Sequence, residues 1–188
     1  MKVLIFEGIA TSGKSTLIQQ LKSSLGYLRL SIVGEAETHV PIMNEAGDVH
    51  IDFFLKLITQ KLASNSDLVI FDRLYLTQAF RSKTGVESYK QVEDLLLHHN
   101  PLTIFLKVTD EAIADRVYKA SQHREASWED YIKTKGQSIE QIAEYYSDQQ
   151  SNQLELLKSS IIPYEIFDTT THNYQEITEN LVAIVTKS

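Results

Sequence analysis

The chain contains no cysteine. This absence excludes disulfide bonds, catalysis by a thiolate and zinc sites built on sulfur, and it fits a cytoplasmic protein. The sequence also has no apolar run close to the about 20 residues that span a bilayer. The apolar residues 3–6 are too few for the core of a signal peptide, and Glu7 follows them at once. We therefore expect a cytoplasmic protein that does not contact a membrane.

Positive charge is scarce as well. The chain has 18 lysines and arginines against 25 aspartates and glutamates, which gives a net charge of −7. A nucleic-acid backbone would be repelled by such a chain, so any bound nucleotide must be held by local cations. Hydrophobic residues make up 43% of the 188 residues, enough for a folded core. No repeat, low-complexity segment or linker divides the sequence, so we expect a single domain over 1–188.

The strongest motif is a phosphate-binding loop with the spacing G-x-x-x-x-G-K-[ST]. It follows an apolar strand pattern over 2–7 and precedes an amphipathic helical pattern. Glycines let the backbone turn so that its N–H groups face phosphate oxygens, and the start of the next helix adds a positive dipole end. The predicted nucleotide-binding residues are Gly8, Ile9, Ala10, Thr11, Ser12, Gly13, Lys14, Ser15 and Thr16.

Particular side chains of this loop and of a later strand have predictable roles. Lys14 should reach the β- and γ-phosphates, and Ser15 should bind Mg²⁺ through its hydroxyl. Residues 68–71 are apolar and end in Asp72, the Walker B pattern, in which the aspartate binds Mg²⁺ directly or through water. Arg73 comes next and is placed to bind a phosphate, with a structural Asp–Arg ion pair as the alternative. The expected cofactors are ATP and Mg²⁺.

Two acidic residues extend the candidate site. Glu35 and Glu37 directly follow the second predicted strand. In open α/β sheets, ligands bind just beyond the carboxyl ends of the strands. A solvated acidic loop would show the same pattern, so both interpretations stay open.

Positive charge is concentrated at Arg116, Lys119, His123 and Arg124 in this otherwise acidic chain. Such a segment favours contact with an anion, and we expect a lid at about 116–127 that closes over the phosphates. Arg116 or Arg124 would then contact the transferred group. A solvated basic helix end is the alternative.

Strand and helix patterns alternate along the whole chain. The predicted strands are 2–7, 28–33, 67–71, 102–106 and 164–168. The predicted helices begin at Lys14 and then cover about 51–62, 75–82, 86–98, 110–119, 128–158 with a break near Gly136, and 174–186. Strands that alternate with helices form a parallel sheet covered on both faces, so we expect an α/β fold, a three-layer α/β/α sandwich.

The motifs together resemble those of the thymidylate kinase and deoxynucleoside kinase group of P-loop kinases. The resemblance rests on Phe6-Glu7-Gly8 leading into Gly13-Lys14-Ser15-Thr16, on Asp72-Arg73 after the third strand, and on the basic lid. It implies a P-loop NTPase fold with a five-stranded parallel sheet of order 2-3-1-4-5, ATP with Mg²⁺, and a nucleoside or nucleoside monophosphate as acceptor. Gly34-Glu35-Ala36 stands where thymidylate kinases usually have Arg-Glu-Pro, so thymidine specificity does not follow.

The expected activity is ATP-dependent phosphoryl transfer, in which positioning and cations do most of the work. A monophosphate acceptor needs arginines, whereas a nucleoside 5′-hydroxyl needs a carboxylate base. Asp72-Arg73 and the basic lid favour the monophosphate. The alternatives are a deoxynucleoside kinase, a P-loop ATPase switch and a nucleotide-binding module without turnover. The expected partners are ATP and a small acceptor, without nucleic acid or membrane, and a homodimer is left open.

Overall fold

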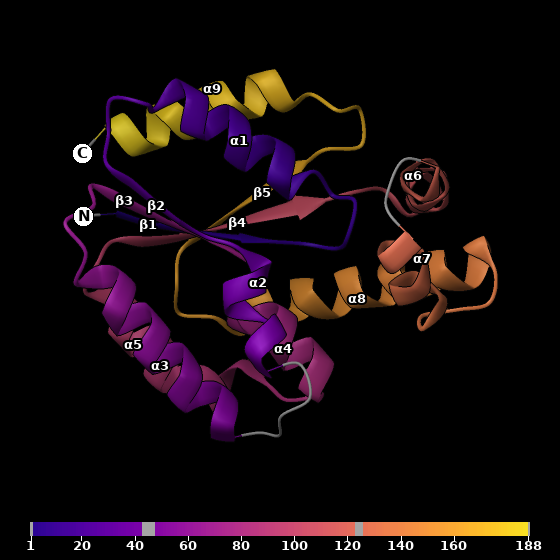
Figure 1. Cartoon of the computed structure of the whole chain (residues 1–188), viewed down its shortest axis with the longest axis horizontal. Coiled ribbons are helices and arrows are strands. Elements are labelled where there is room, and N and C mark those ends of the chain that lie inside the picture. Colours follow the sequence, from indigo (N-terminus) through magenta and orange to yellow (C-terminus); the bar gives the residue numbers. More distant parts are fainter. Residues whose placement is uncertain (1, 43–47, 123–125, 188) are drawn as a thin grey trace.

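A computed structural model of the chain describes residues 2–42, 48–122 and 126–187. At its centre lies a parallel sheet in the order β2-β3-β1-β4-β5 (Figure 1). The strands are β1 (Lys2–Glu7), β2 (Leu30–Val33), β3 (Leu68–Asp72), β4 (Pro101–Lys107) and β5 (Tyr164–Asp168). The fold class and the strand order expected from the sequence are confirmed.

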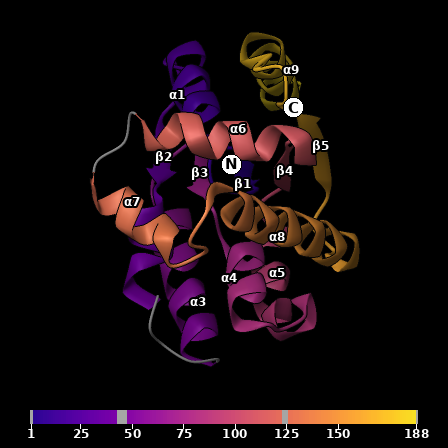
Figure 2. The same cartoon turned by 90° about the vertical axis from the view of Figure 1, so that its right-hand side faces the viewer.

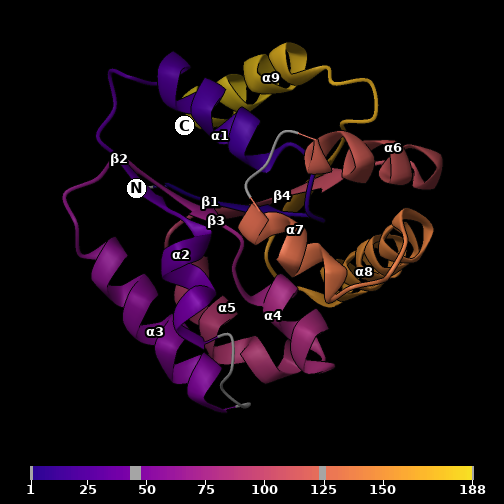
Figure 3. The same cartoon turned by 45° about the vertical axis from the view of Figure 1, so that its right-hand side comes forward.

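Helices cover both faces of the sheet. On one face, α1 (Lys14–Ser24) and α9 (Tyr174–Thr186) pack side by side (Figure 1). The other face carries α3 (Asp48–Leu62), α4 (Tyr75–Ser82), α5 (Lys90–Leu97) and α8 (Ile139–Ser159), as Figure 3 also shows. Among the described residues, no helix combines the length and the apolar character needed to cross a membrane.

Two further helices lie beyond the carboxyl ends of the strands. Figure 2 looks onto this end of the molecule, with α6 (Asp110–Ser121) and α7 (Ala126–Lys133) toward the viewer. They are held to α8 and to the end of β1 by a buried cluster of their own. Its fully buried members are Ile9, Val108, Ile113, Val117, Ile132, Ile142 and Tyr146. This packing places α6 and α7 next to the phosphate-binding loop.

The central strand shows how the layers form. Val3 and Ile5 of β1 belong to the apolar cluster under α3, α4 and α5, whereas Leu4 and Phe6 belong to the cluster under α1 and α9. Successive side chains of a strand point to opposite faces, and here both faces are covered. The run of apolar residues in β1 is therefore core on both sides.

The structure differs from the sequence expectation in the segment after β2. The acidic residues, for which a solvated loop was one of two open interpretations, form a short helix, α2 (Glu35–Thr38), followed by a 3-10 turn (Val40–Ile42). Thr38 and His39 are buried, and the Thr38 hydroxyl donates to the carbonyl oxygen of Asp72 at 3.3 Å. This contact with β3 anchors a turn whose local sequence, which is polar, is typical of a loop. The helix predicted over 86–98 likewise begins as a 3-10 turn (Val86–Tyr89) before α5.

Candidate active site at the carboxyl edge of the sheet

The phosphate-binding loop joins β1 to α1 and requires glycine at two positions. The φ angle is 130° at Gly8 and 96° at Gly13, values that residues with side chains rarely adopt. A Cβ at Gly8 would lie 2.5 Å from the carbonyl oxygen of Leu106, and one at Gly13 would lie 2.4 Å from the ring of Tyr174. Both backbone conformation and close packing therefore fix the shape of the loop.

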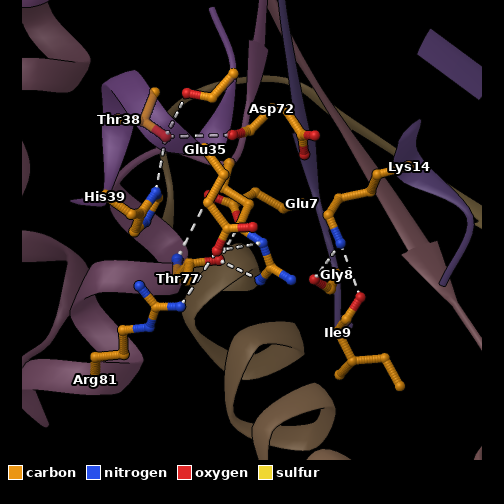
Figure 4. Close-up of polar contacts among 12 residues, drawn as sticks. Glu7, Gly8, Ile9, Lys14, Glu35, Thr38, His39, Asp72, Thr77 and Arg81 are labelled. Atoms are coloured by element: carbon orange, nitrogen blue, oxygen red, sulfur yellow. Dashed lines mark hydrogen bonds and ion pairs between the residues drawn. The ribbon is translucent and has the colours of Figure 1, made fainter. Parts of the chain in front are cut away.

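Lys14 is buried within this loop (Figure 4). Its Nζ donates to the carbonyl oxygens of Gly8 at 3.0 Å and Ile9 at 2.8 Å. Burial, together with the positive charge of Arg73, lowers the pKa of Lys14 to about 7. The ammonium group is thus held by loop carbonyls, in an environment that disfavours its charge until an anion comes close.

Asp72 ends β3 beside the loop, because β1 and β3 pair with Phe6 opposite Asp72. Its Oδ1 is buried and has no hydrogen-bond partner. Ser15 lines the same hollow from the first turn of α1. An unpartnered carboxylate oxygen and a hydroxyl fit Mg²⁺, which uses few protein ligands and completes its shell with phosphate and water. No group of three or more histidine, aspartate or glutamate side chains that could hold a metal ion occurs in the described ranges.

Glu7 is a fully buried carboxylate at the end of β1 that binds the start of α4. It accepts from the N–H of Leu74 at 2.9 Å and from the hydroxyl of Thr77 at 2.6 Å. Burial raises the pKa of Glu7, while the Thr77 and Leu74 hydrogen bonds and the charge of Arg73 oppose that rise. The contact fixes the turn in which Arg73 has a φ of 67°, and Arg73 Nη1 donates to the same Thr77 hydroxyl at 3.4 Å.

Arg73 and Arg81 converge on one carboxylate, that of Glu35. Figure 4 shows Arg81 directed at this carboxylate. Glu35 Oε1 lies 3.4 Å from Arg73 Nε and 3.4 Å from Arg81 Nη2. Arg73 is buried, and its Nε makes no well-formed hydrogen bond. Glu37, by contrast, turns away and pairs with Lys61 at 2.5 Å on the surface. Of the two acidic residues that follow β2, only Glu35 therefore belongs to the site.

The ionisation of Glu35 is set by opposing effects. Burial by itself would raise the pKa of Glu35, but nearby positive charges, led by Arg73 and Lys14, lower it to about 2. The carboxylate is consequently ionised at neutral pH. Its pairing with the arginines identifies a position in the hollow that accommodates a negative group.

A hollow of about 500 Å³ joins these groups. The phosphate-binding loop, α2, the end of β3 with the turn after it, and α4 contribute the residues described above, and α7 adds Trp128 and Tyr131. The segment before α9 adds His172, and α9 adds its first residue, Tyr174; the two rings meet edge to face with centroids 5.7 Å apart. The hollow is large enough for a nucleotide-sized ligand and combines flat apolar surfaces with cationic groups.

Most residues predicted from the sequence meet in this hollow. Its lining includes Ala10, Thr11, Gly13, Lys14, Ser15, Thr16, Glu35, Asp72, Arg73 and Arg116. Gly8, Ile9 and Ser12 belong to the same loop but do not line the hollow, and the side chains of Ile9 and Ser12 are buried beneath it.

Arg116 lies in α6 and is buried against the loop. Its Nη1 donates to the carbonyl oxygen of Thr11 at 2.9 Å, and its Nη2 donates to the carbonyl oxygen of Thr169. Arg116 therefore ties the phosphate-binding loop to the segment after β5. The predicted lid at about 116–127 includes the end of α6 and the start of α7, while His123 and Arg124 lie outside the described residues.

Sequence reasoning missed several contributors to the site, among them Trp128 and His172. Glu7 belongs to the Phe6-Glu7-Gly8 motif of the resemblance, but nothing local marks it as the residue that holds the start of α4. Arg81 had a detectable signal, because Thr77 and Arg81 are four residues apart on one face of the predicted helix over 75–82. Tyr174 and Tyr131 come from distant helices, and only the tertiary structure brings them to the loop.

Comparisons with known proteins identify solved structures with a similar fold. No protein-family model matches the sequence, and no curated protein sequence matches it significantly. The YorR protein from Bacillus subtilis, solved in complex with phosphorylated GDP, is similar with a TM-score of 0.66 and 18% identity, over 97% of this chain and 95% of that chain. Shikimate kinase from Acinetobacter baumannii, in complex with shikimate, has a TM-score of 0.57 and 14% identity, over 98% and 92%. The chain therefore has the fold of the P-loop kinases.

Proposed function

We propose that this protein transfers the γ-phosphoryl group of ATP to a nucleoside monophosphate, in the manner of a thymidylate kinase. The observation that carries the proposal is the convergence of Arg73 and Arg81 on one anionic group, in the hollow that begins at the phosphate-binding loop. A second phosphate-bearing substrate needs such a clamp in addition to the donor site, because its charge must be neutralised beside that of ATP.

The donor half of the proposal uses the loop. Its backbone N–H groups and Lys14 would bind the β- and γ-phosphates, and Lys14 Nζ would exchange the loop carbonyls for phosphate oxygens. Ser15 and Asp72 would hold Mg²⁺, which neutralises charge on the phosphate oxygens when it is bound. His172 and Tyr174 offer flat surfaces for the base of the donor.

In the acceptor half, Glu35 stands in for the acceptor's phosphate when the acceptor is absent. Its carboxylate pairs with both arginines, and its side chain is about half exposed, so it can turn out into solvent. A phosphate could then accept hydrogen bonds from both guanidinium groups in planar, paired geometry. Glu7 and Thr77 would keep Arg73 in place during this exchange.

A deoxynucleoside kinase is the second candidate, because Glu35 could take the proton of a 5′-hydroxyl. A pKa of about 2 makes Glu35 a weak base in this arrangement, which favours the monophosphate. Product analysis decides between them: the protein is incubated with Mg²⁺, ATP and a panel of nucleosides and nucleoside monophosphates. Diphosphate products support the proposal, whereas monophosphates formed from nucleosides support the alternative.

The same experiment addresses the other classes. Release of phosphate without a phosphorylated acceptor would indicate an ATPase switch, and binding of ATP without turnover would indicate a binding module. Lys14→Ala should lower any transfer rate by about 10²–10³, as is typical when one preorganised electrostatic contact is removed. Near-normal transfer by a folded Lys14→Ala variant would exclude the loop as the donor site.

Two substitutions separate the acceptor classes. With a monophosphate acceptor, Arg73→Ala should reduce kcat/KM by about 10² or more, and Glu35→Gln should reduce it less, because the arginine carries the binding. With a nucleoside acceptor the order should reverse. Arg29→Ala is the matched control, since Arg29 is an exposed arginine that pairs with Asp67. If neither substitution alters transfer to any nucleotide or nucleoside, the acceptor assignment is wrong.

A further inference from the structure

A second hollow of about 530 Å³ lies between the end of α4, the segment after α7, and α8. Arg81 and Tyr131 line both this hollow and the one at the phosphate-binding loop. Arg81 Nη2 lies 3.5 Å from the Tyr131 hydroxyl, so these two side chains form the boundary between the hollows. None of the groups assigned to phosphoryl transfer, other than Arg81, faces the second hollow.

The lining of the second hollow is cationic. Arg81, Lys83 and Lys135 contribute positive charge, and no acidic side chain of the described residues lines it. In a chain of net charge −7, this is a local reversal of sign. A cavity with one sign of charge on its walls attracts ligands of the opposite sign.

Lys83 occupies a backbone position at which glycine is usual. It follows α4 with a φ of 53°, in the left-handed region. The N–H of Thr84 donates to the carbonyl oxygen of Ala79 at 3.0 Å, which is the helix-ending pattern that normally places glycine there. A lysine at this position strains the backbone, and its side chain lines the hollow.

The remaining walls are aromatic. The rings of Phe80 and Tyr145 meet edge to face with centroids 5.8 Å apart, and both line the hollow with Tyr131. Lys135 Nζ lies 4.9 Å from the centroid of the Tyr131 ring and 5.1 Å from that of Tyr145. Flat rings beside cationic groups recognise ligands that are themselves planar and negatively charged.

We propose that this second hollow is a binding site for a planar organic anion, separate from the phosphoryl-transfer pocket. The ring of the ligand lies against Phe80, Tyr131 and Tyr145, and its negative groups pair with Lys83 and Lys135. Because Arg81 borders both hollows, it is the residue through which their occupants interact. The proposal does not depend on the proposed function, since it concerns binding at residues outside the donor site.

The test measures binding by titration calorimetry, with naphthalene-1,5-disulfonate as the planar dianion and ethane-1,2-disulfonate as a dianion without a ring. We expect the naphthalene probe to bind with one equivalent and the ethane probe to bind at least about tenfold more weakly. Lys135→Gln and Lys83→Gly should each weaken the binding of the naphthalene probe about tenfold, because each variant loses a charge-assisted contact with it. Lys83→Gly should also melt at the same or a higher temperature, since glycine relieves the backbone strain.

Two variants serve as controls. Lys133→Gln removes an exposed lysine of α7 that does not line the hollow, and Lys14→Ala disables the donor site. Both should bind the naphthalene probe as the unmodified chain does. The proposal is overturned if the naphthalene probe fails to bind or if Lys14→Ala abolishes its binding. It is also overturned if Lys83→Gly and Lys135→Gln leave the binding of this probe unchanged, or if the ring-free probe binds equally well. None of these measurements requires turnover, so they are independent of the acceptor experiments.

Discussion

At the scale of single residues, the main electrostatic feature is that charged side chains of the candidate site are paired with other groups of the protein. Lys14 Nζ binds carbonyl oxygens of its own loop, and Glu35 pairs with Arg73 and Arg81. Each arrangement keeps a buried or half-buried charge partnered, which avoids the high cost of an uncompensated charge. Under the proposed function, a bound phosphate replaces these partners.

The lowered pKa of Lys14 predicts a proton uptake that accompanies nucleotide binding. With a pKa of about 7 in the unliganded chain, Lys14 is largely neutral at pH 8, and a bound triphosphate favours its charged form. Binding at pH 8 should therefore take up close to one proton, and the affinity should fall as the pH rises above 7. Calorimetry in buffers of different ionisation enthalpy measures this uptake.

Lys14→Arg is the matched control for this experiment, because an arginine stays charged throughout this pH range. The variant should bind nucleotide without the proton uptake seen with lysine. Binding by the unmodified chain at pH 8 with no proton exchange would contradict the assignment of Lys14 to the phosphates.

At the scale of elements, the phosphate-binding loop depends on its contact with the start of α9. Gly13 has a φ of 96°, and a Cβ there would meet the ring of Tyr174 at 2.4 Å. The loop is therefore shaped by the strand before it and by a helix that begins about 160 residues later, consistent with long-range packing around a parallel sheet. Arg116 adds a second tie, which joins the loop to the segment between β5 and α9.

Gly13→Ala should destabilise the fold by about 1–3 kcal/mol and weaken nucleotide binding, because it combines a strained φ with a clash. Gly13→Ala combined with Tyr174→Ala should recover part of the loss but not all, since the backbone strain remains. Gly34→Ala is the matched control, because Gly34 has a φ of −82° and open space around its Cβ position. Thermal unfolding and nucleotide titration measure these effects, and equal behaviour of the two glycine variants would refute the argument.

Helix α7 supplies Trp128 and Tyr131 to the hollow at the phosphate-binding loop. Trp128 is the chain's single tryptophan, so its fluorescence reports on this hollow alone. Addition of Mg²⁺-ATP and acceptor should change the emission and slow amide exchange across α7, because the ligands contact the helix. In Arg73→Ala, the acceptor-dependent change should require a higher acceptor concentration while the ATP-dependent change persists. Identical exchange of α7 with and without both ligands would exclude its role as a lid.

At the scale of the whole molecule, three apolar clusters are joined through the sheet. β1 contributes to the clusters on both faces, and Ile9, just beyond its end, contributes to the cluster under α6, α7 and α8. A chain whose clusters share one strand should unfold as one unit. The single domain over 1–188 remains a prediction that unfolding can test.

We expect denaturant unfolding followed by Trp128 emission to coincide with unfolding followed by far-ultraviolet circular dichroism. Trp128 reports on α7, whereas the dichroism reports on all helices, so a separate unit around α7 and α8 would give two transitions. Mg²⁺-ATP at about 100 times its dissociation constant should stabilise the chain by about 2.7 kcal/mol. The Lys14→Ala variant should lose most of that stabilisation while still unfolding in one step. Two separated transitions in the unmodified chain would exclude a single domain.

The sequence by itself determined the order of elements, the strand order through the motif resemblance, and the residues of the loop for which we predict phosphate binding. These features are local: strand and helix periods, the G-x-x-x-x-G-K-S spacing, and a carboxylate at the end of a buried strand all lie within short windows. The position of Gly136 between α7 and α8 was predictable for the same reason. The place of Asp72 and Arg73 in the candidate site was predictable because they come directly after an apolar strand pattern.

Only the tertiary structure decided which charged residues face one another. Glu35 and Glu37 have the same local setting, yet one meets the two arginines and the other pairs with Lys61, because α2 is a helix anchored to β3 by Thr38. The role of Glu7 depends on a helix that begins 68 residues later. Contacts between distant segments depend on how the layers pack. Neither residue spacing nor composition predicts which of these segments will meet.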